Sequence, residues 1–517
     1  MRRSTTKWTV LAALVVLTVG FGVTKSQAEG PDREAMRAKM MERIDTNRDG
    51  IISSEERAKA KAEFAKRFPN HGKAWKPNFK MEPGLFVIDK DFQLFDMKAI
   101  VDPSTLKLEV KKDWTNIEGD TPARTKTVSF RVNTVLDGVD ARAEVQFIVP
   151  RDRKAKGFLI TNNGLGGDNF KEHESTLLRN GIGLVKTALT GEGPGGMVSV
   201  YIARLDPTHS NEYCLWPATI MRAITAAYAE KDHFEKGKIV TYGGSKHGAS
   251  SHIAIIHDDR ITAAFTKVCP ISHSPVRLHD NKIWHERERI RYGGFVGGLY
   301  GINNTKKFVD FGHKWEDIET YCKKIAPSLF LSLNKEKLQK RGVELLSDPG
   351  THDGVAYTVH SMGKYAPWVP VVFRPNGGHR GDGNPPYNPN LNVAVLRHFL
   401  GADQPRLLPP AVKHEKRGDT FEVTITFQKG NELKEGEFWW VYDRAEEGSD
   451  KYFEAQFDQK RRLQLKQVSP LVWEAEFTLE TDKNTVDCFA NFYRMANIAG
   501  EERRETISSP YTRVELK

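Results

Sequence analysis

The side chain best suited to covalent chemistry is Ser245, which stands among closely spaced glycines. An apolar, β-branched run from Lys238 to Tyr242 predicts a buried strand before it, and small residues open a helical pattern after it. A nucleophilic serine must stand clear of the sheet at a sharp turn, so Gly243 and Gly248 would let strand and helix approach closely. The second glycine comes one place later than in the G-x-S-x-G pattern. We predict a nucleophile at Ser245; the alternative is a glycine-rich turn with an incidental serine.

A base and an acid for this serine are predicted at the ends of two later strands. The strand-like runs 342–346 and 369–373 each lead into polar residues, and Asp353 and His379 follow them. In this order His379 would accept the serine proton, and Asp353 would hold the imidazole in the correct tautomer. Asp348 is an alternative acid. Glycines directly before His379 let its loop turn inwards and favour it over three other histidines, His352, His360 and His398.

A glycine loop offers backbone donors for a developing oxyanion. It runs from Asn162 to Asp168, directly after a buried strand predicted at 157–161. Such a loop supplies half of an oxyanion hole, and the residue after the nucleophile supplies the other half. We therefore expect donors at Gly164, Leu165 and the backbone N–H of Lys246. A phosphate-binding loop is a poorer interpretation, because G-x-x-x-x-G-K-[ST] is absent from the sequence.

Strands alternate with helices over residues 73–405, which predicts a mostly parallel sheet covered by helices on both faces. The first two strands form an antiparallel hairpin around Asp137 and Gly138. The expected strands are 128–132, 145–149, 157–161, 182–185, 238–242, 261–268, 342–346 and 369–373, and the expected helices are 218–229 and 392–400. Residues 270–340 fit no strand pattern and form either a lid over the site or a structural helical excursion.

Residues 406–517 show a different pattern. Several short strand-like runs separated by turns predict a β-sandwich. These runs are 421–427, 438–442, 473–479, 486–493 and 511–516. Trp439 and Trp440 either bind a polymer chain or, as we favour, pack in the core.

An EF-hand calcium loop is predicted in the segment 29–72, between flanks of helical pattern. Gly50 stands at its sharp turn. Oxygen ligands would come from Asp45, Asn47, Asp49, the carbonyl of Ile51, Ser53 and Glu56. The loop is single, so its affinity is expected to be modest and its role structural; the alternative is a degenerate loop that no longer binds.

The chain has 517 residues, 39% of them hydrophobic, which predicts two or three domains. Basic residues before an apolar run from Val10 to Val23, and a small-x-small site ending at Ala28, predict a signal peptide over residues 1–28. The protein is then secreted or periplasmic, with no stable membrane span after cleavage. A net charge of +10 is scattered along the chain, which does not favour nucleic-acid binding. Four cysteines show no metal-binding spacing.

Two motifs, Gly-Gly-Ser245-Lys-His-Gly and Asn-Gly-Gly-His379, resemble two groups of α/β-hydrolases. One group is the PhoPQ-activated pathogenicity-related proteins, which also end in a β-domain. The other is the branch of glucuronoyl and acetyl xylan esterases. The resemblance implies an α/β-hydrolase fold over 73–405 with a C-terminal β-sandwich. In the glucuronoyl esterases a basic residue after the serine helps to bind the oxyanion, and Lys246 takes that place here.

The function expected from these features is a secreted serine hydrolase, most simply a carboxylic-ester hydrolase, with no cofactor for catalysis. The substrate would carry an ester, in one version linked to carbohydrate. A serine peptidase is the alternative within enzymes. The alternative outside enzymes is a non-catalytic, calcium-dependent protein that binds polysaccharide or the cell envelope.

Overall fold

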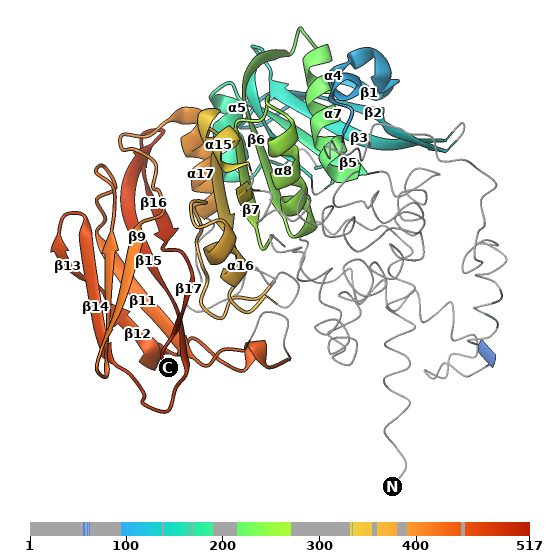
Figure 1. The fold of residues 1–517 in the computed structure, drawn as a ribbon. Coiled ribbons are helices and arrows are strands. Elements are labelled where there is room, and N and C mark those ends of the chain that lie inside the picture. The colour runs from blue at the N-terminus through green and yellow to red at the C-terminus, as the bar shows by residue number, and fades with distance from the viewer. Residues whose placement is uncertain are drawn as a thin grey trace. The chain divides into compact units, whose positions relative to one another are not determined.

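The computed structural model divides the chain into two compact units, Met1–Met81 and Glu82–Lys517. It describes residues 55, 56, 59, 62, 95–136, 139–162, 164–166, 169–189, 215–269, 331–332, 334–353, 359–379, 390–445 and 450–517 (Figure 1). The described residues of the first unit are four helical positions, one of which, Glu56, is buried. The predicted signal peptide and the other five predicted calcium ligands lie outside the described residues.

The second unit contains an eight-stranded sheet in the order β1-β2-β3-β5-β4-β6-β7-β8. Strands β4 to β8 run parallel to one another, whereas β1, β2 and β3 pair antiparallel and β3 joins β5 antiparallel. The strands are β1 Glu109–Ile117, β2 Ala123–Leu136, β3 Val139–Pro150, β4 Ala155–Thr161, β5 Gly183–Leu189, β6 Phe234–Gly244, β7 Ala263–Lys267 and β8 Glu344–Asp348. The sequence analysis did not predict β1, because nearly all of its side chains are exposed and no alternation marks it.

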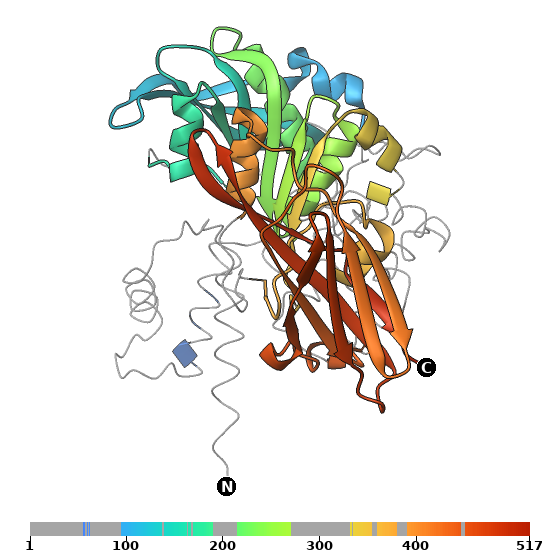
Figure 2. The same cartoon turned by 90° about the vertical axis from the view of Figure 1, so that its left-hand side faces the viewer.

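Four helices pair up on the two faces of this sheet (Figure 2). Helix α7 (Trp216–Ala229) packs against α8 (Lys246–His257), and α17 (Asn390–Leu400) packs against α5 (Glu172–Arg179). Successive residues of β4 show that the two pairs lie on opposite faces. Leu159 joins a core cluster with α5 and α17, whereas Phe158 contacts Tyr228 of α7. The predicted layering of helices on both sides is therefore confirmed.

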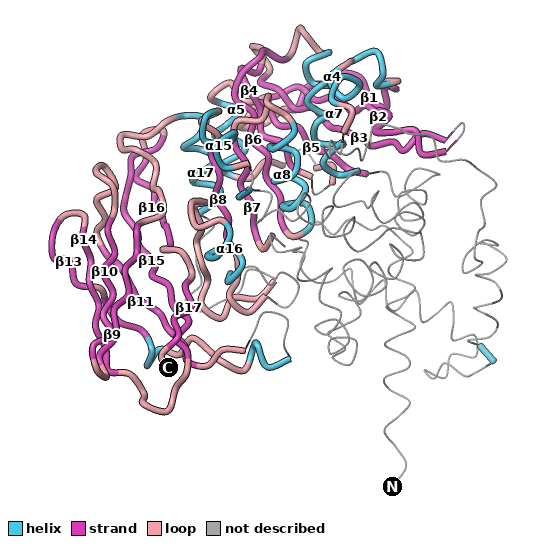
Figure 3. Tube along the Cα trace, in the orientation of Figure 1, coloured by secondary structure: helices cyan, strands magenta, loops and turns pink. Residues whose placement is uncertain are grey.

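The C-terminal part of the second unit is built from two antiparallel sheets (Figure 3). One has the order β13-β14-β10-β9, and the other has the order β12-β11-β15-β16 with β17 also paired to β15. The strands are β9 Ala411–Arg417, β10 Thr420–Thr426, β11 Glu435–Tyr442, β12 Arg462–Gln464, β13 Lys466–Ser469, β14 Val472–Thr478, β15 Thr485–Ile498, β16 Glu501–Ser508 and β17 Thr512–Glu515. Alternate residues of β10 and β11 meet in one apolar core, which makes this a β-sandwich. Trp439 and Trp440 are both buried, as the core-packing interpretation predicted.

The sandwich packs on the first sheet through its long hairpin β15–β16. Ala496 and Ile498 enter the core cluster that includes α5 and α17. Arg397 of α17 forms an ion pair of 2.8 Å with Glu505, which also binds the buried Arg494. Apolar burial and the Arg397–Glu505 ion pair thus fix this hairpin against the helical layer.

The predicted strand 369–373 differs from expectation. It makes only isolated parallel bridges, Ser347 with Val371 and Gly350 with Arg374, although it lies beside β8 as predicted. Within 270–340, the described residues 335–340 form helix α15, Lys335–Lys340, and residues 270–330 lie outside the described part. Helix α16, Val359–Tyr365, and four short helical segments complete the described elements: α4 Met97–Val101, η1 Pro103–Leu106, η4 Asp450–Phe453 and η5 Gln459–Arg461. None of the helices among the described residues is long and apolar enough to cross a membrane.

Candidate active site

Ser245 occupies the turn between β6 and α8 in a backbone conformation that residues other than glycine rarely adopt. Its φ is 54° and its ψ is −134°. The strain is held from both sides, because its N–H donates to the carbonyl of Lys267 at 2.8 Å and its carbonyl accepts from the N–H of Gly248 at 2.9 Å. A strained serine at a strand–helix turn, fixed by its surroundings, is the geometry of a nucleophile elbow.

The glycines of the elbow are there because strand and helix nearly touch. A Cβ at Gly243 would lie 2.6 Å from the carbonyl oxygen of His247, and a Cβ at Gly248 would lie 3.1 Å from that of Gly243. Gly244 is different, since a Cβ there would meet only the Lys267 carbonyl at 3.6 Å. The close approach falls on Gly248, which explains why the second glycine follows Ser245 by three residues instead of two.

Asp353 and His379 lie in direct contact. Nδ1 of His379 lies 2.8 Å from Oδ2 and 3.1 Å from Oδ1 of Asp353. The Asp353 side chain is fully buried, whereas that of His379 is 30% exposed. A buried carboxylate on Nδ1 leaves Nε2 of the imidazole as the nitrogen that can exchange a proton with a hydroxyl.

Backbone hydrogen bonds connect the strand ends that carry these residues. The N–H of Ser245 bonds Lys267 at the end of β7, and the N–H of Val268 bonds Asp348 at the end of β8 at 2.9 Å. The N–H of Thr351 then bonds Arg374 at 3.1 Å. The elbow and the Asp353–His379 pair therefore follow the carboxyl ends of neighbouring strands. Among the described residues no hydrogen bond joins Ser245 Oγ to His379, and in ligand-free enzymes such bonds are often long.

Asp348, the alternative acid, has a different partner. Its Oδ1 accepts a hydrogen bond of 2.7 Å from Nε of the buried Arg374. Burial raises the pKa of Asp348, and the charge of Arg374 opposes that shift. The guanidinium also donates to the carbonyl of Gly378 at 3.3 Å. Asp348 therefore braces the loop before His379 through Arg374 and does not hold the imidazole.

The three expected oxyanion donors differ in their hydrogen bonds. The N–H of Gly164 donates to the Thr187 carbonyl at 3.1 Å, and that of Gly166 donates to Oε1 of Gln146 at 3.1 Å. Leu165 lies between them, and no acceptor for its N–H is found among the described residues. Lys246 is the first residue of α8, so its N–H has no acceptor within the helix. Among the described residues, the N–H of Gly164 is therefore already bound, whereas no acceptor is found for the N–H groups of Leu165 and Lys246.

Gln146 was missed by the sequence analysis. It is buried in β3, and its amide fixes the glycine loop at Gly166 and approaches Thr125 at 3.3 Å. The signal was present, because Gln146 is the one polar residue in the apolar run from Val145 to Val149. A buried polar side chain requires a hydrogen-bond partner, and here the partner is the backbone of the glycine loop.

Two of the alternative histidines have other hydrogen-bond partners. Nε2 of His398 lies 2.8 Å from Thr262 Oγ1, and Nε2 of His352 lies 2.9 Å from the Ala455 carbonyl. A second apparent dyad is the contact of 3.7 Å between Cys269 Sγ and His252 Nδ1. Burial raises the pKa of Cys269 well above its usual value and lowers the pKa of His252 to about 4. Both groups stay neutral at pH 7, so this pair does not supply a thiolate nucleophile.

No cluster of metal-ligating side chains is found within the described ranges. Of the predicted calcium ligands only Glu56 falls in them. The calcium site stays a prediction.

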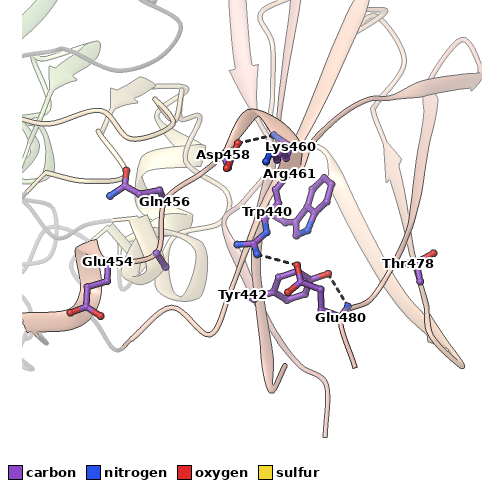
Figure 4. Close-up of a pocket in the computed structure, with 10 residues that line it drawn as sticks. Trp440, Tyr442, Glu454, Gln456, Asp458, Lys460, Arg461, Thr478 and Glu480 are labelled. Carbon is purple, nitrogen blue, oxygen red and sulfur yellow. Dashed lines mark hydrogen bonds and ion pairs between the residues drawn. The ribbon is translucent and has the colours of Figure 1, made fainter. Parts of the chain in front are cut away.

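A pocket of about 580 Å³ opens on the β-sandwich. It lies between the segment 454–461 and the strands β11 and β14 (Figure 4). An ion pair of 3.0 Å joins Arg461 to Glu480 in it, and the guanidinium covers the ring of Tyr442. Its lining contains neither Ser245 nor His379, so it is separate from the candidate chemistry.

The sheet order, the strained elbow after β6, and the Asp–His pair beyond the next strands define an α/β-hydrolase fold joined to a β-sandwich.

Comparison with solved structures gives distant matches. An acetyl xylan esterase from Paenibacillus sp. R4 is 15% identical, with 63% of this chain and 96% of that chain covered and a TM-score of 0.41. A CE15 glucuronoyl esterase from Teredinibacter turnerae T7901 is 14% identical over 51% and 65% of the two chains, with a TM-score of 0.32. An acylaminoacyl peptidase from Pyrococcus horikoshii is 13% identical over 52% and 46%, also at 0.32. Similarities this distant do not identify an activity or a substrate. No protein-family model and no curated protein matches the chain.

Proposed function

We propose that this protein is a serine hydrolase that cleaves carboxylic esters through Ser245, His379 and Asp353. The observation that carries the proposal is the contact of 2.8 Å between Asp353 and Nδ1 of His379, beyond the strand ends that neighbour the strained Ser245. A serine in that conformation is costly to maintain, and such strain concentrates at active sites.

The chemistry follows from which atoms are engaged. Nδ1 of His379 is bound by Asp353, so Nε2 takes the proton of Ser245 Oγ as this oxygen attacks the ester carbonyl. The tetrahedral oxyanion accepts hydrogen bonds from the backbone N–H groups of Leu165 and Lys246. His379 then gives its proton to the departing alkoxide, and the acyl group remains on Ser245. Water, deprotonated by the same imidazole, releases the acid and restores the serine.

The proposed enzyme is exported and binds calcium. The predicted signal peptide directs it out of the cytoplasm, and the EF-hand holds a structural Ca²⁺ ion that takes no part in the chemistry. The substrate is an ester, for which a carbohydrate-linked ester is one candidate.

Ser245→Ala in the full-length protein tests the assignment. The purified protein is assayed with p-nitrophenyl acetate and labelled with a fluorophosphonate probe, and the labelled peptide is mapped. We expect hydrolysis and labelling of Ser245 in the parent protein and neither in the variant, with an unchanged melting temperature. Full activity in the variant would reject the proposal.

Parallel assays separate the alternatives. Cleavage of acyl-peptide substrates but not of esters would assign a peptidase. Retention on a polysaccharide column in calcium, without any probe labelling, would favour a non-catalytic binding protein.

A further inference from the structure

The loop before His379 is tied to the sandwich by a reciprocal pair of hydrogen bonds. The side chain of Asn376 donates through Nδ2 to the carbonyl of Phe457 at 2.9 Å and accepts through Oδ1 from the N–H of Phe457 at 2.8 Å. Asn376 has a φ of 54°, and asparagine is one of the few residues that adopt this conformation readily. A side chain that imitates a strand partner in this way fixes both the position and the direction of the loop.

The loop before Asp353 is held by the same sandwich segment. Nε2 of His352 lies 2.9 Å from the carbonyl of Ala455, two residues from Phe457. Burial and the positive charge of Arg444 lower the pKa of His352 to about 3, so its ring is neutral at pH 7 and Nε2 donates this bond. Asp353 is the next residue in the chain, so this bond acts directly beside the buried carboxylate.

A third tie comes from Arg444, which is buried in the sandwich. Its guanidinium donates to the carbonyl of Thr351 and, at 2.9 Å, to the hydroxyl of Tyr511. It also stacks 3.8 Å above the ring of Tyr452. Because Thr351 Oγ1 in turn accepts from the N–H of Asn376 at 2.7 Å, the two loops are joined to each other as well as to the sandwich.

The segment that precedes these loops also depends on the sandwich. Among the described residues, no strand pairs with residues 371–373 on the side away from β8. Their backbone is bound instead by Ser508, whose N–H donates to the Val371 carbonyl at 2.7 Å and whose Oγ accepts from the Phe373 N–H at 2.8 Å. Asn491 donates to the Phe373 carbonyl at 3.1 Å. The sandwich thus replaces the neighbouring strand that this edge lacks.

We propose that the C-terminal sandwich positions the catalytic loops. Asn376 and His352 are the positioning residues, and their bonds to the sandwich hold Asp353 and His379 in register with Ser245. This inference rests on the proposed hydrolase function. Every tie described here ends within three residues of Asp353 or His379, or on the strand that leads to His379. Small displacements of a catalytic group can reduce turnover about 100-fold.

The test compares variants of the full-length protein. Asn376→Gly keeps the backbone conformation accessible and removes both bonds to Phe457. His352→Ala removes the bond to Ala455, and His352→Gln restores an amide nitrogen at the same reach. The control is Gln456→Ala, because Gln456 is an exposed residue between Ala455 and Phe457, and its amide bonds the Phe453 carbonyl and nothing else in the described part of the chain.

We expect kcat on p-nitrophenyl acetate to fall about 10- to 100-fold in Asn376→Gly and His352→Ala. KM should stay within about twofold, because neither substitution changes Ser245 or the proposed oxyanion donors. His352→Gln should recover much of the lost kcat, and Gln456→Ala should match the parent. Assays run well below each melting temperature separate misplacement of the pair from loss of fold.

A proton NMR measurement separates this inference from the proposed function. The downfield signal of the imidazole Nδ1–H bound to a carboxylate, assigned by its loss in Asp353→Asn, should broaden or shift in Asn376→Gly. Parental kcat together with an unchanged signal in Asn376→Gly would overturn the positioning role. A parent protein with no ester hydrolysis and no labelling at Ser245 would overturn the proposed function, and the NMR signal alone would then decide the positioning role.

Discussion

Nε of Arg374 lies 2.7 Å from Oδ1 of Asp348, and both side chains are buried. The two nearby aspartates therefore have different roles: Asp348 binds Arg374, and Asp353 contacts His379. We expect Asp353→Asn to lower kcat by about 10⁴, as the amide favours the wrong imidazole tautomer. Ester kinetics at saturating substrate measure the effect.

Asp348→Asn should show the opposite pattern. Removing the Asp348 carboxylate from its buried pair with Arg374 should cost about 3–5 kcal/mol in the free energy of unfolding. Activity below the melting temperature should fall by no more than about tenfold, because the contact with His379 is intact. Urea denaturation and ester kinetics on both variants test the division, and a stable but inactive Asp348→Asn would reverse the two roles.

The elbow predicts different tolerance at adjacent glycines. Gly243→Ala would place Cβ 2.6 Å from the His247 carbonyl and should destabilise the protein by about 1–3 kcal/mol while displacing Ser245. Gly244→Ala is the matched control, since its Cβ would meet the Lys267 carbonyl only at 3.6 Å. Equal melting temperatures and equal probe-labelling rates in the two variants would contradict the close approach described here.

Leu165 should matter for its N–H and not for its side chain. Leu165→Pro removes the donor and should lower kcat about 10²–10³-fold, the usual effect of losing one oxyanion contact. Leu165→Ala keeps the N–H and should retain activity, because the leucine side chain is 38% exposed. Comparable kinetics in both variants would remove Leu165 from the oxyanion hole.

Acid should destabilise the protein below pH 6.5. Burial lowers the pKa of four histidines to about 3 or 4; they are His252, His257, His352 and His414. Between these values and 6.5 the unfolded chain binds protons that the folded protein does not, so the free energy of unfolding decreases as pH falls. Each histidine contributes up to about 1.4 kcal/mol per pH unit. Urea denaturation at pH 5 to 6.5 measures the slope, and His252→Asn should reduce it by one histidine's share; an unchanged slope would show that His252 titrates normally.

Calcium binding can be tested at one pair of neighbouring residues. Glu56→Gln removes the predicted bidentate ligand and should weaken binding strongly in titration calorimetry of the full chain, from an expected dissociation constant of about 10⁻⁴–10⁻³ M. Glu55→Gln changes the adjacent, exposed glutamate and should bind like the parent. Ester hydrolysis should persist in a chelator at temperatures where the protein stays folded. Equal affinities for the two variants would dismiss the predicted loop.

The sequence alone was sufficient where the signal is local. Gly243 and Gly248 are required because the backbone of β6 and that of the start of α8 lie in contact there. This requirement for glycine can be read from a few consecutive residues. The buried runs that became β4, β6 and β7 were found for a similar reason, since a strand covered on both faces must be apolar throughout. Strand β1 escaped prediction because it buries almost nothing.

Only the tertiary structure distinguished residues of equal local quality. Asp348 is the last residue of β8 and Asp353 follows it closely, and what separates them is Arg374, which lies 26 residues beyond Asp348. Gly164 and Leu165 were equivalent until the Thr187 carbonyl was seen to accept one of the two N–H groups. The alternation of apolar and polar residues predicted the sandwich as a domain. The sequence did not predict its hydrogen bonds to Asn376 and His352. Hydrogen bonds between distant segments depend on which backbones the tertiary structure brings together. Hydrophobic periodicity reports only local burial, so it does not predict these contacts.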